Sequence, residues 1–182
     1  MRIIVVNLKT AVVAGVLAAG LCLAPAARAD SLGTASSEGI ASVKISQMIS
    51  IAKTASAANG GNLNFGEIYS PPSADTVTMT TAGVREAGND NILGNDADVS
   101  PASFTVNGEP SNSFNISPIP DTEISDGGGN FMEVTDFTPS LAGSGTLTDG
   151  IYTFTIGATL HVAADQPPGV YAGTFDVTVN YN

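Results

Sequence analysis

The only histidine of the chain, His161, is the first side chain to consider for chemistry. A catalytic imidazole acts on a nucleophile or is oriented by a carboxylate, and the sequence carries no motif that supplies either group. With one cysteine besides that histidine, the chain also has almost no ligands for a zinc or copper site. We therefore predict that His161 is a solvated strand residue and that the protein is not an enzyme. No catalytic residue, cofactor or metal site is predicted.

A second candidate is the polar loop from Gly88 to Asp98, which reads Gly-Asn-Asp-Asn-Ile-Leu-Gly-Asn-Asp-Ala-Asp. Calcium takes about six to eight oxygen ligands, and Asp90, Asp96 and Asp98 offer carboxylates between glycines. The loop matches half of a calcium-binding nonapeptide, but such repeats work by stacking and the chain holds barely one. Because Asn, Asp and Gly are ordinary turn residues, we favour a plain polar loop and keep weak calcium binding as the alternative. The acidic run from Asp121 to Asp126 is a weaker candidate.

The clearest pattern of secondary structure, which includes His161, lies in the last stretch of the chain. From Phe154 to Val162 the apolar residues fall on every second position, with threonines, glycine and His161 between them. After the breaker run from Asp165 to Gly169, the alternation resumes from Tyr171 to Tyr181. Successive side chains of a strand point to opposite faces. We therefore predict two half-buried strands that form a closing hairpin.

The same period of two recurs in shorter runs from residue 41 onward. Ala41 to Ile51 alternates with a phase slip at Gln47-Met48, which predicts one long strand with a bend or bulge; a short helix is the alternative. Ala102 to Val106 and Phe114 to Ile116 flank the turn from Asn107 to Pro110 and are predicted to form a hairpin. Further short strands are expected at Leu63 to Gly66, Thr76 to Thr81 and Phe131 to Phe137.

This organisation predicts an all-β fold of about eight strands. No segment shows a sustained period of 3.6 residues, and the 20 glycines and 10 prolines fall mainly between the predicted strands. Such a pattern is typical of a two-sheet sandwich or a barrel. We favour the sandwich because the strand lengths are uneven and the connection from Gly83 to Pro101 is long.

The first 29 residues are predicted to be a secretory signal peptide. Arg2 and Lys9 give a basic start, Ala11 to Leu23 is an apolar run, and Ala27-Arg28-Ala29 is a small-x-small cleavage site. Cys22 follows a bulky leucine, so lipoprotein processing is not expected. The apolar run is too short to span a bilayer and no second one follows, which predicts no membrane span in the mature protein.

The expected organisation is therefore a signal peptide over residues 1–29, a flexible N-terminal arm over 30–40 and a single β-sandwich domain over 41–182. The protein is expected to be exported to the periplasm, the outer cell surface or the extracellular space. Beyond residue 29 three basic residues stand against all 17 acidic ones, a formal charge of −14. This charge argues against nucleic acid and anionic membrane surfaces as partners.

Several stretches in order resemble a known group of sequences. They are Leu63-Asn64-Phe65-Gly66, Ala102 to Gly108, Met132-Glu133-Val134, Gly145-Thr146-Leu147, Ile156 to Leu160 and Gly169 to Asn182. In that order they resemble the exported bacterial proteins catalogued as domain of unknown function 4402, from about Val43 to the last residue. That resemblance implies export and an all-β fold, and it implies no reaction.

A more distant likeness is to archaic chaperone–usher pilins of the spore-coat-U type. It rests on a strand followed by Leu-Asn-Phe-Gly and on a final Gly-x-Tyr-x-Gly-Thr-Phe-x-Val-Thr-Val strand, here from Gly169 to Val179. The likeness implies an immunoglobulin-like sandwich that lacks one strand and takes it from the next subunit. This chain departs from those pilins because it lacks their cysteines and because residues 30–39 are poor in the alternating apolar residues of a donor strand.

The function expected from these observations is a non-catalytic exported structural subunit of pilus or cell-surface type, with copies of itself or a secretion chaperone and usher as partners. The alternative is a secreted or periplasmic binding module for a carbohydrate or a weakly bound calcium ion. Two arrangements remain open for the first strand, Ala41 to Ile51. It lies beside Tyr171 to Tyr181 in the same chain, giving a monomer, or it enters a neighbour and joins subunits head to tail.

Overall fold

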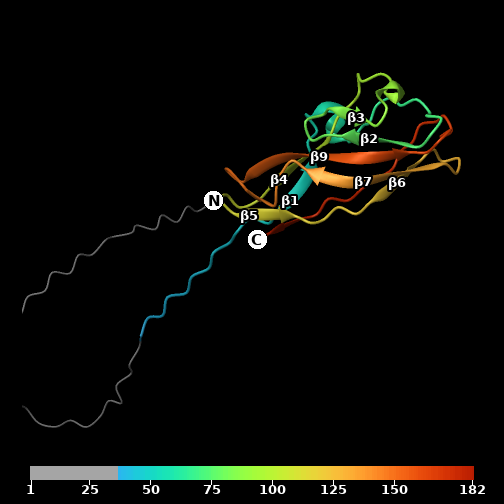
Figure 1. The fold of residues 1–182 in the computed structure, drawn as a ribbon. Helices are drawn as coiled ribbons and strands as arrows, with labels where there is room; N and C mark the ends of the chain where they lie inside the picture. Colours follow the sequence, from blue (N-terminus) through green and yellow to red (C-terminus); the bar gives the residue numbers. More distant parts are fainter. Residues whose placement is uncertain (1–36) are drawn as a thin grey trace, which may run out of the picture. The chain divides into compact units, whose positions relative to one another are not determined.

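The computed structural model describes residues 37–182 of the chain (Figure 1). The predicted signal peptide and the start of the arm lie outside the described residues. The chain divides into two units, residues 1–42 and residues 43–182. In the first unit, the described residues 37–42 form no strand and are exposed. No helix among residues 37–182 is long and apolar enough to cross a membrane.

The second unit is a two-sheet β-sandwich, which confirms the predicted fold class. One sheet has seven strands and the other has three. In chain order the strands are β1 (Ser50–Lys53), β2 (Asp75–Met79), β3 (Arg85–Ala87), β4 (Ala102–Asn107), β5 (Ser113–Ile116), β6 (Thr122–Ser125), β7 (Phe131–Pro139), β8 (Ser144–Thr146), β9 (Ile151–Val162) and β10 (Val179–Tyr181). Two short 3-10 turns, η1 (Ala58–Gly61) and η2 (Asp90–Ile92), lie in the connections on either side of β2 and β3.

The large sheet is built around β9, its longest strand. The first half of β9 pairs with β4, and the second half pairs with β2. β7 pairs with β9 as well, with a register shift between Thr135 and Thr138. Asp136 lies at that bulge with a φ of 53°. All of these pairings are antiparallel, so one long alternating strand holds three neighbours in register.

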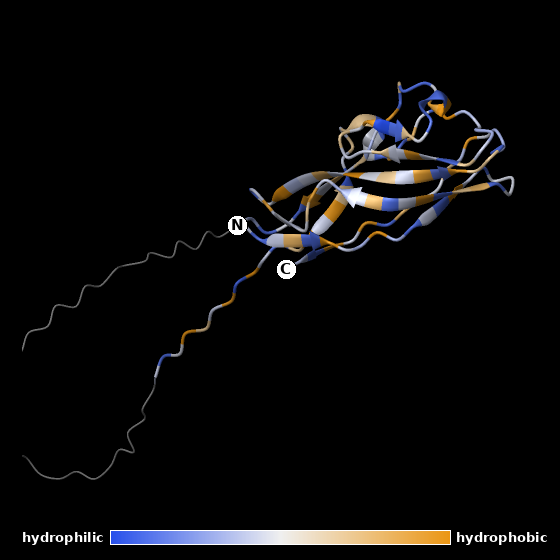
Figure 2. Cartoon of the chain, in the orientation of Figure 1, coloured by the Kyte–Doolittle hydropathy of each residue, from blue (hydrophilic) through white to orange (hydrophobic). Residues whose placement is uncertain are grey.

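The core is formed by the inward side chains of β9 and the layers that cover them. Phe154, Ile156, Ala158, Leu160 and Val162 are all buried, as their spacing predicted. The three-stranded sheet covers the Phe154 and Ile156 end, where Phe114, Leu147 and Val179 complete one cluster. At the other end, Leu160 and Val162 pack with Val77, Ile92 and Val134. The regular change between apolar and polar residues along the long strands is visible in Figure 2.

Both predicted hairpins are wrong, because each predicted pair of strands is split between the two sheets. β4 belongs to the large sheet, whereas β5 pairs with β8 and β10 in the small one. β9 and β10 are likewise in different sheets. An alternating pattern indicates which side chains face a core, but it does not say which neighbour a strand pairs with. The connections after β4 and β9 therefore cross from one sheet to the other.

The predicted long strands at the two ends of the domain are much shorter in the structure. The first, predicted over Ala41 to Ile51, begins only at Ser50 and pairs with β4 rather than with the end of the chain. The last, predicted over Tyr171 to Tyr181, is reduced to β10. Residues 174–178 still alternate in exposure, and Ala172 exchanges two backbone hydrogen bonds with Ser125 of β6. That segment is an extended chain beside a sheet edge rather than a continuous strand.

Candidate functional site

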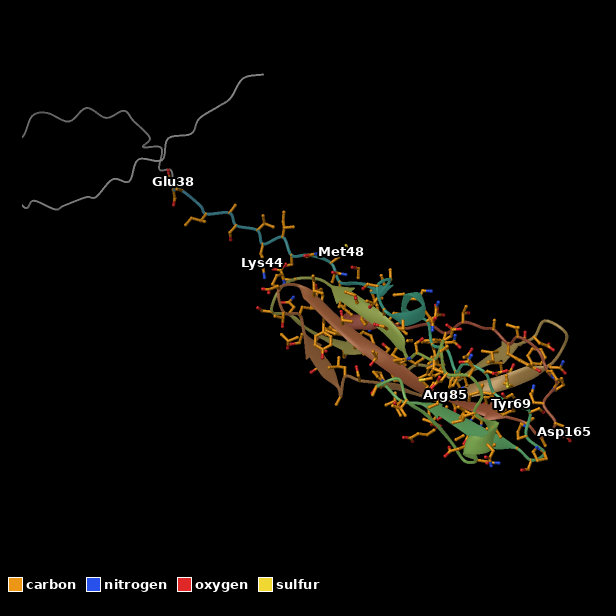
Figure 3. The ribbon with its side chains drawn as sticks, turned by 90° about the horizontal axis from the view of Figure 1, so that it is seen from above. Glu38, Lys44, Met48, Tyr69, Arg85 and Asp165 are labelled. Atoms are coloured by element: carbon orange, nitrogen blue, oxygen red, sulfur yellow. The ribbon has the colours of Figure 1, made fainter. Side chains whose placement is uncertain are left out.

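The polar loop from Gly88 to Asp98, for which weak calcium binding is the alternative prediction, is organised by Arg85, the first residue of β3. The guanidinium group donates hydrogen bonds to the backbone oxygens of Phe65 (2.8 Å), Glu67 (2.8 Å), Gly94 (2.9 Å) and Asn95 (3.4 Å). Its fork of donors thus bridges two separate stretches of loop. Arg85 is labelled in Figure 3. A calcium ion in this loop would need backbone carbonyl oxygens as ligands. Those of Gly94 and Asn95 already accept hydrogen bonds from the Arg85 guanidinium group.

Two acidic side chains of the same region accept hydrogen bonds from backbone N–H groups. Glu67 accepts a hydrogen bond from the Asn95 N–H at 3.0 Å, and Asp75 accepts one from the Asn89 N–H at 3.0 Å. Across residues 37–182, no three His, Cys, Asp or Glu side chains gather in a way that could hold a metal ion. The carboxylates of Asp90, Asp96 and Asp98 are not brought together in such a group.

In the acidic run from Asp121 to Asp126, the last carboxylate shapes a turn. Asp126 accepts hydrogen bonds from the Asn130 side-chain amide at 2.6 Å and from the backbone N–H groups of Gly128 (2.7 Å) and Asn130 (3.1 Å). The Asn130 amide and these N–H groups lower the pKa of Asp126 below its ordinary value. These bonds within the turn give Asp126 a structural role.

His161 lies on the solvent-facing side of β9, as its position in the alternation predicted. Its Nε2 atom is hydrogen-bonded to the Thr135 hydroxyl at 2.9 Å, so its partner is a threonine of β7 and not a carboxylate. The strand registers place Thr76, His161, Glu133 and Glu123 in one row across β2, β9, β7 and β6. Glu133 and Glu123 are therefore direct cross-strand neighbours of the same charge.

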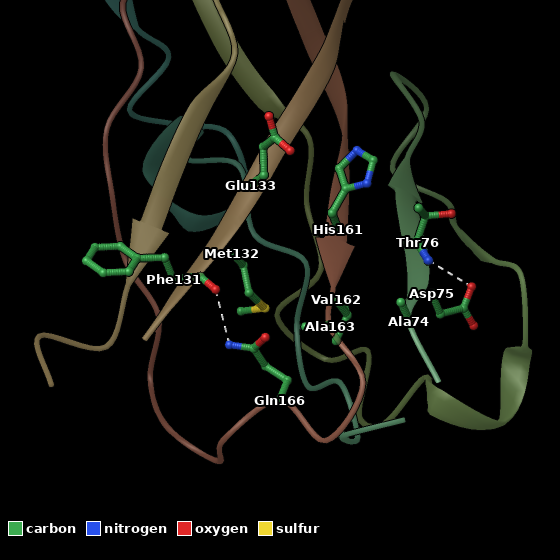
Figure 4. A pocket seen from close by; sticks show the side chains of 10 residues that line it. All are labelled: Ala74, Asp75, Thr76, Phe131, Met132, Glu133, His161, Val162, Ala163 and Gln166. Carbon is green, nitrogen blue, oxygen red and sulfur yellow. Dashed lines mark hydrogen bonds between the residues drawn. The ribbon is translucent and has the colours of Figure 1, made fainter. Parts of the chain in front are cut away.

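This row borders a pocket of about 350 Å³ at the end of β9, which we call the Glu133 groove (Figure 4). It lies between β2, the start of β7 and the loop after β9, and its lining includes Asp75, Thr76, Met132, Glu133, Val162 and Gln166. The volume falls in the range of small-molecule sites, roughly 300–1,000 Å³. No lysine or arginine lines it.

Gln166 is the buried polar residue of the Glu133 groove, with 7% of its surface exposed. Its side-chain amide nitrogen donates to the Phe131 carbonyl at 3.2 Å and to the Tyr171 hydroxyl at 3.0 Å. A backbone carbonyl can only accept, so this contact fixes which end of the amide is nitrogen. The Oε1 atom accepts no hydrogen bond from the described residues, and in Figure 4 it points toward Met132 and Val162.

A second, apolar pocket of about 230 Å³ opens between the two sheets and is called here the Phe137 groove. Its lining comes from the end of β5 and the following loop, from the end of β7 and from the approach to β8. Its apolar residues Ile116, Ile119, Phe137 and Leu141 are partly buried and pack against the core cluster of Phe114. The groove is thus a place where the core reaches the surface.

A third feature is the N-terminal segment, defined here as residues 40–48. Ile40, Val43, Ile45 and Met48 are between 85% and 98% exposed. Its end is held by two hydrogen bonds: the Gln47 N–H donates to the Glu109 carboxylate at 2.9 Å, and the Tyr181 hydroxyl donates to the Gln47 carbonyl at 3.0 Å. The Glu109 N–H in turn donates to the Tyr181 oxygen at 2.6 Å. Lys44 lies 3.5 Å from the Glu109 carboxylate.

The hydrogen bond from the Gln47 N–H lowers the pKa of Glu109 below its ordinary value of 4.5, and the Lys44 charge lowers it further. A carboxylate whose folded pKa is depressed stabilises the bound arrangement above its unfolded pKa, and that contribution is lost as pH falls through the folded pKa. We therefore expect the amide proton resonance of Gln47 to titrate with a midpoint below 4.5. A pH titration by NMR measures it, and Glu109→Gln should abolish the transition. A midpoint at or above the ordinary value would contradict the contact.

Three of these residues were not singled out by the sequence. Arg85 carried one signal, since it is the only arginine after residue 28. Gln166 lay inside a run of turn residues, and Glu109 lay in a predicted hairpin turn. Their roles depend on which distant segments meet them, and a local pattern does not contain that information.

The fold and these surfaces define a class: an all-β, two-sheet sandwich with two surface grooves and an exposed apolar segment before its first strand. The sequence model of one family, Domain of unknown function (DUF4402), matches residues 49–181. The chain belongs to this family. The match begins one residue before β1 and includes every strand of both sheets. No curated protein and no solved structure matches the chain.

Proposed function

We propose that the protein is a non-catalytic exported structural subunit of pilus or cell-surface type, and that its copies join through the N-terminal segment. One observation carries the proposal: four large apolar side chains within nine residues are almost fully exposed, in a stretch that forms no strand. Single exposed apolar residues are normal on proteins, but a group of them marks a surface that binds something.

The energy available from covering the segment is large for its length. Burial of one Val, Ile or Met side chain contributes roughly 1.5–3 kcal/mol. An extended segment also has free backbone groups that can pair with a sheet edge, with alternate side chains entering pockets. Val43 and Ile45 are spaced for that geometry, because residues two apart on an extended chain face the same way.

The Phe137 groove is the surface that fits this segment best. It lies between the two sheets, where an added extended chain meets both, and its apolar side chains already belong to the core cluster. Val43 and Ile45 are themselves 85% and 89% exposed, so they do not fill the groove of their own domain. We assign the groove to the N-terminal segment of a second copy.

The remaining parts of the proposal rest on the sequence. Export rests on residues 1–29, with their basic start, apolar run and cleavage site. The non-catalytic role is supported by the surroundings of His161, whose hydrogen-bond partner is Thr135 and not a carboxylate that would orient it. The alternative function, a binding module, is favoured by the Glu133 groove alone.

A labelled peptide of residues 37–49 tests the assembly. We expect it to bind the purified protein saturably in fluorescence anisotropy, because the groove of each molecule is free to accept it. The Ile45→Asp peptide should bind at least about tenfold more weakly, since a buried charge replaces an apolar contact.

Variants of the protein locate the binding surface. Leu141→Asp in the Phe137 groove should abolish peptide binding, whereas Val170→Asp should not, because Val170 is 89% exposed and outside the groove. Circular dichroism confirms that each variant is folded. Absence of peptide binding, or equal binding by the Leu141 and Val170 variants, would refute assembly through this groove.

A further inference from the structure

We propose that the Glu133 groove binds a small aliphatic amine in its ammonium form. The groove lies at the end of β9, and its lining comes from β2, β7, β9 and the loop that carries Gln166, not from the N-terminal segment or the Phe137 groove. The inference is therefore independent of how copies of the protein assemble.

The first argument is the unused oxygen of Gln166. No buried side-chain nitrogen or oxygen in the described residues lacks a hydrogen-bond partner, so the Gln166 oxygen, which accepts no hydrogen bond there, is itself open to solvent. Both described bonds of this side chain are made by its nitrogen, so the oxygen is left as an acceptor on the groove side. A ligand that carries a hydrogen-bond donor can use that oxygen as an acceptor.

The second argument is the charge of the groove. Glu133 and Asp75 line it, and no basic residue does. Glu123 stands directly opposite Glu133 on β6, and two like charges at such a cross-strand position repel each other. A bound cation relieves this repulsion. Anions are disfavoured at the same place for the same reason.

The third argument selects an organic ammonium group rather than a metal ion. No group of three metal-ligating side chains forms anywhere in the described chain, the groove included. The groove also has an apolar part, made by the Met132 side chain and by Val162, which is buried. An alkyl stem can pack there while an ammonium group donates to the acceptors at the edge. An ammonium group has donors only, which matches a site whose side chains are mainly acceptors.

The probes are putrescine, butylamine and an Nα-acetylated lysine amide, with butanediol as a neutral analogue of putrescine. Because His161 is the only histidine and lines the groove, its ring proton resonances in NMR report on this site alone. We expect saturable shifts with the amines and much weaker ones with butanediol. Higher salt should weaken amine binding, because exposed charges are screened. Putrescine binding alone identifies a free polyamine as the ligand, and equal binding of the lysine amide identifies a lysine side chain.

Charge-removing variants complete the test. Glu133→Gln keeps the shape of the side chain and should weaken amine binding at least about tenfold, since a hydrogen bond to a charged group is among the stronger kinds. Glu86→Gln is the matched control, because Glu86 is an exposed strand residue outside the groove. The proposal is overturned if no amine gives a saturable shift, if butanediol binds as well as putrescine, or if Glu133→Gln binds amines as the original protein does.

Discussion

Replacement of Phe114 by alanine should lower the free energy of unfolding by about 3–5 kcal/mol, the usual cost of removing a buried phenylalanine ring. Phe114 has no exposed surface and lies on β5, the central strand of the small sheet. Its ring contacts Tyr152 of β9 edge to face, with 5.5 Å between centroids. Phe114 therefore joins the small sheet to the large one. Urea denaturation, followed by circular dichroism, measures the change.

The cavity left by Phe114→Ala cannot be filled easily from its own sheet. Gly145 of β8 lies against the ring, with no side chain that could move into the space. Phe131→Ala provides a matched control, because Phe131 is 56% exposed, and we expect a loss of about 1 kcal/mol or less from its smaller burial. Equal losses for the two variants would mean that the small sheet contributes little to stability.

The interior of the large sheet could be predicted from the sequence because its signal is local. Phe154 to Val162 alternates without interruption, and every second residue of that run is buried in the structure. The same alternation places His161, between the buried residues Leu160 and Val162, on the solvent-facing side of β9. A period of two decides which face a side chain occupies, and this information is complete within one strand.

The pairing of strands could not be predicted in this way. The turn from Asn107 to Pro110 has residues typical of a hairpin, yet it connects β4 of one sheet to β5 of the other. Similarly, the stretch from Tyr171 to Val177 alternates like a strand, but only Ala172 pairs with another chain segment, as an isolated bridge to Ser125. Register and sheet membership depend on contacts between distant residues.

For the candidate sites too, the local properties of a residue could be predicted, but its distant neighbours could not. The sequence indicated that His161 is solvated, but Glu133, Thr76 and Gln166 come from other segments, and only the register of three strands and a loop brings them together. For the N-terminal segment, the alternation of Val43 and Ile45 predicts a strand and leaves open whether that strand pairs in its own chain or in a neighbour. The same pattern is required of a strand that is paired elsewhere, so the sequence alone could not distinguish the two arrangements.

Substitution of Gly157 by alanine is expected to destabilise the fold by about 3 kcal/mol, at the upper end of the cost of overpacking. Gly157 lies in the middle of β9, between the segments that pair with β4 and with β2. A Cβ atom at this position would overlap the Met79 carbonyl oxygen and press on the backbone of Thr80 and Thr81. These are main-chain atoms, which cannot rotate away as the end of a side chain can.

Relief of that overlap requires β2 to move away from β9, which breaks contacts of the buried residues Val77 and Met79. The loss should therefore appear both in urea denaturation and as faster hydrogen exchange along β2. Gly39→Ala is the matched control, since a Cβ atom at Gly39 meets nothing within 4 Å, and it should leave stability unchanged. If Gly157→Ala were as stable as Gly39→Ala, the backbone of β2 would not lie as close to Gly157 as the structure places it. If instead stability fell while exchange along β2 stayed the same, the strain would have been absorbed by β7, the third strand that pairs with β9.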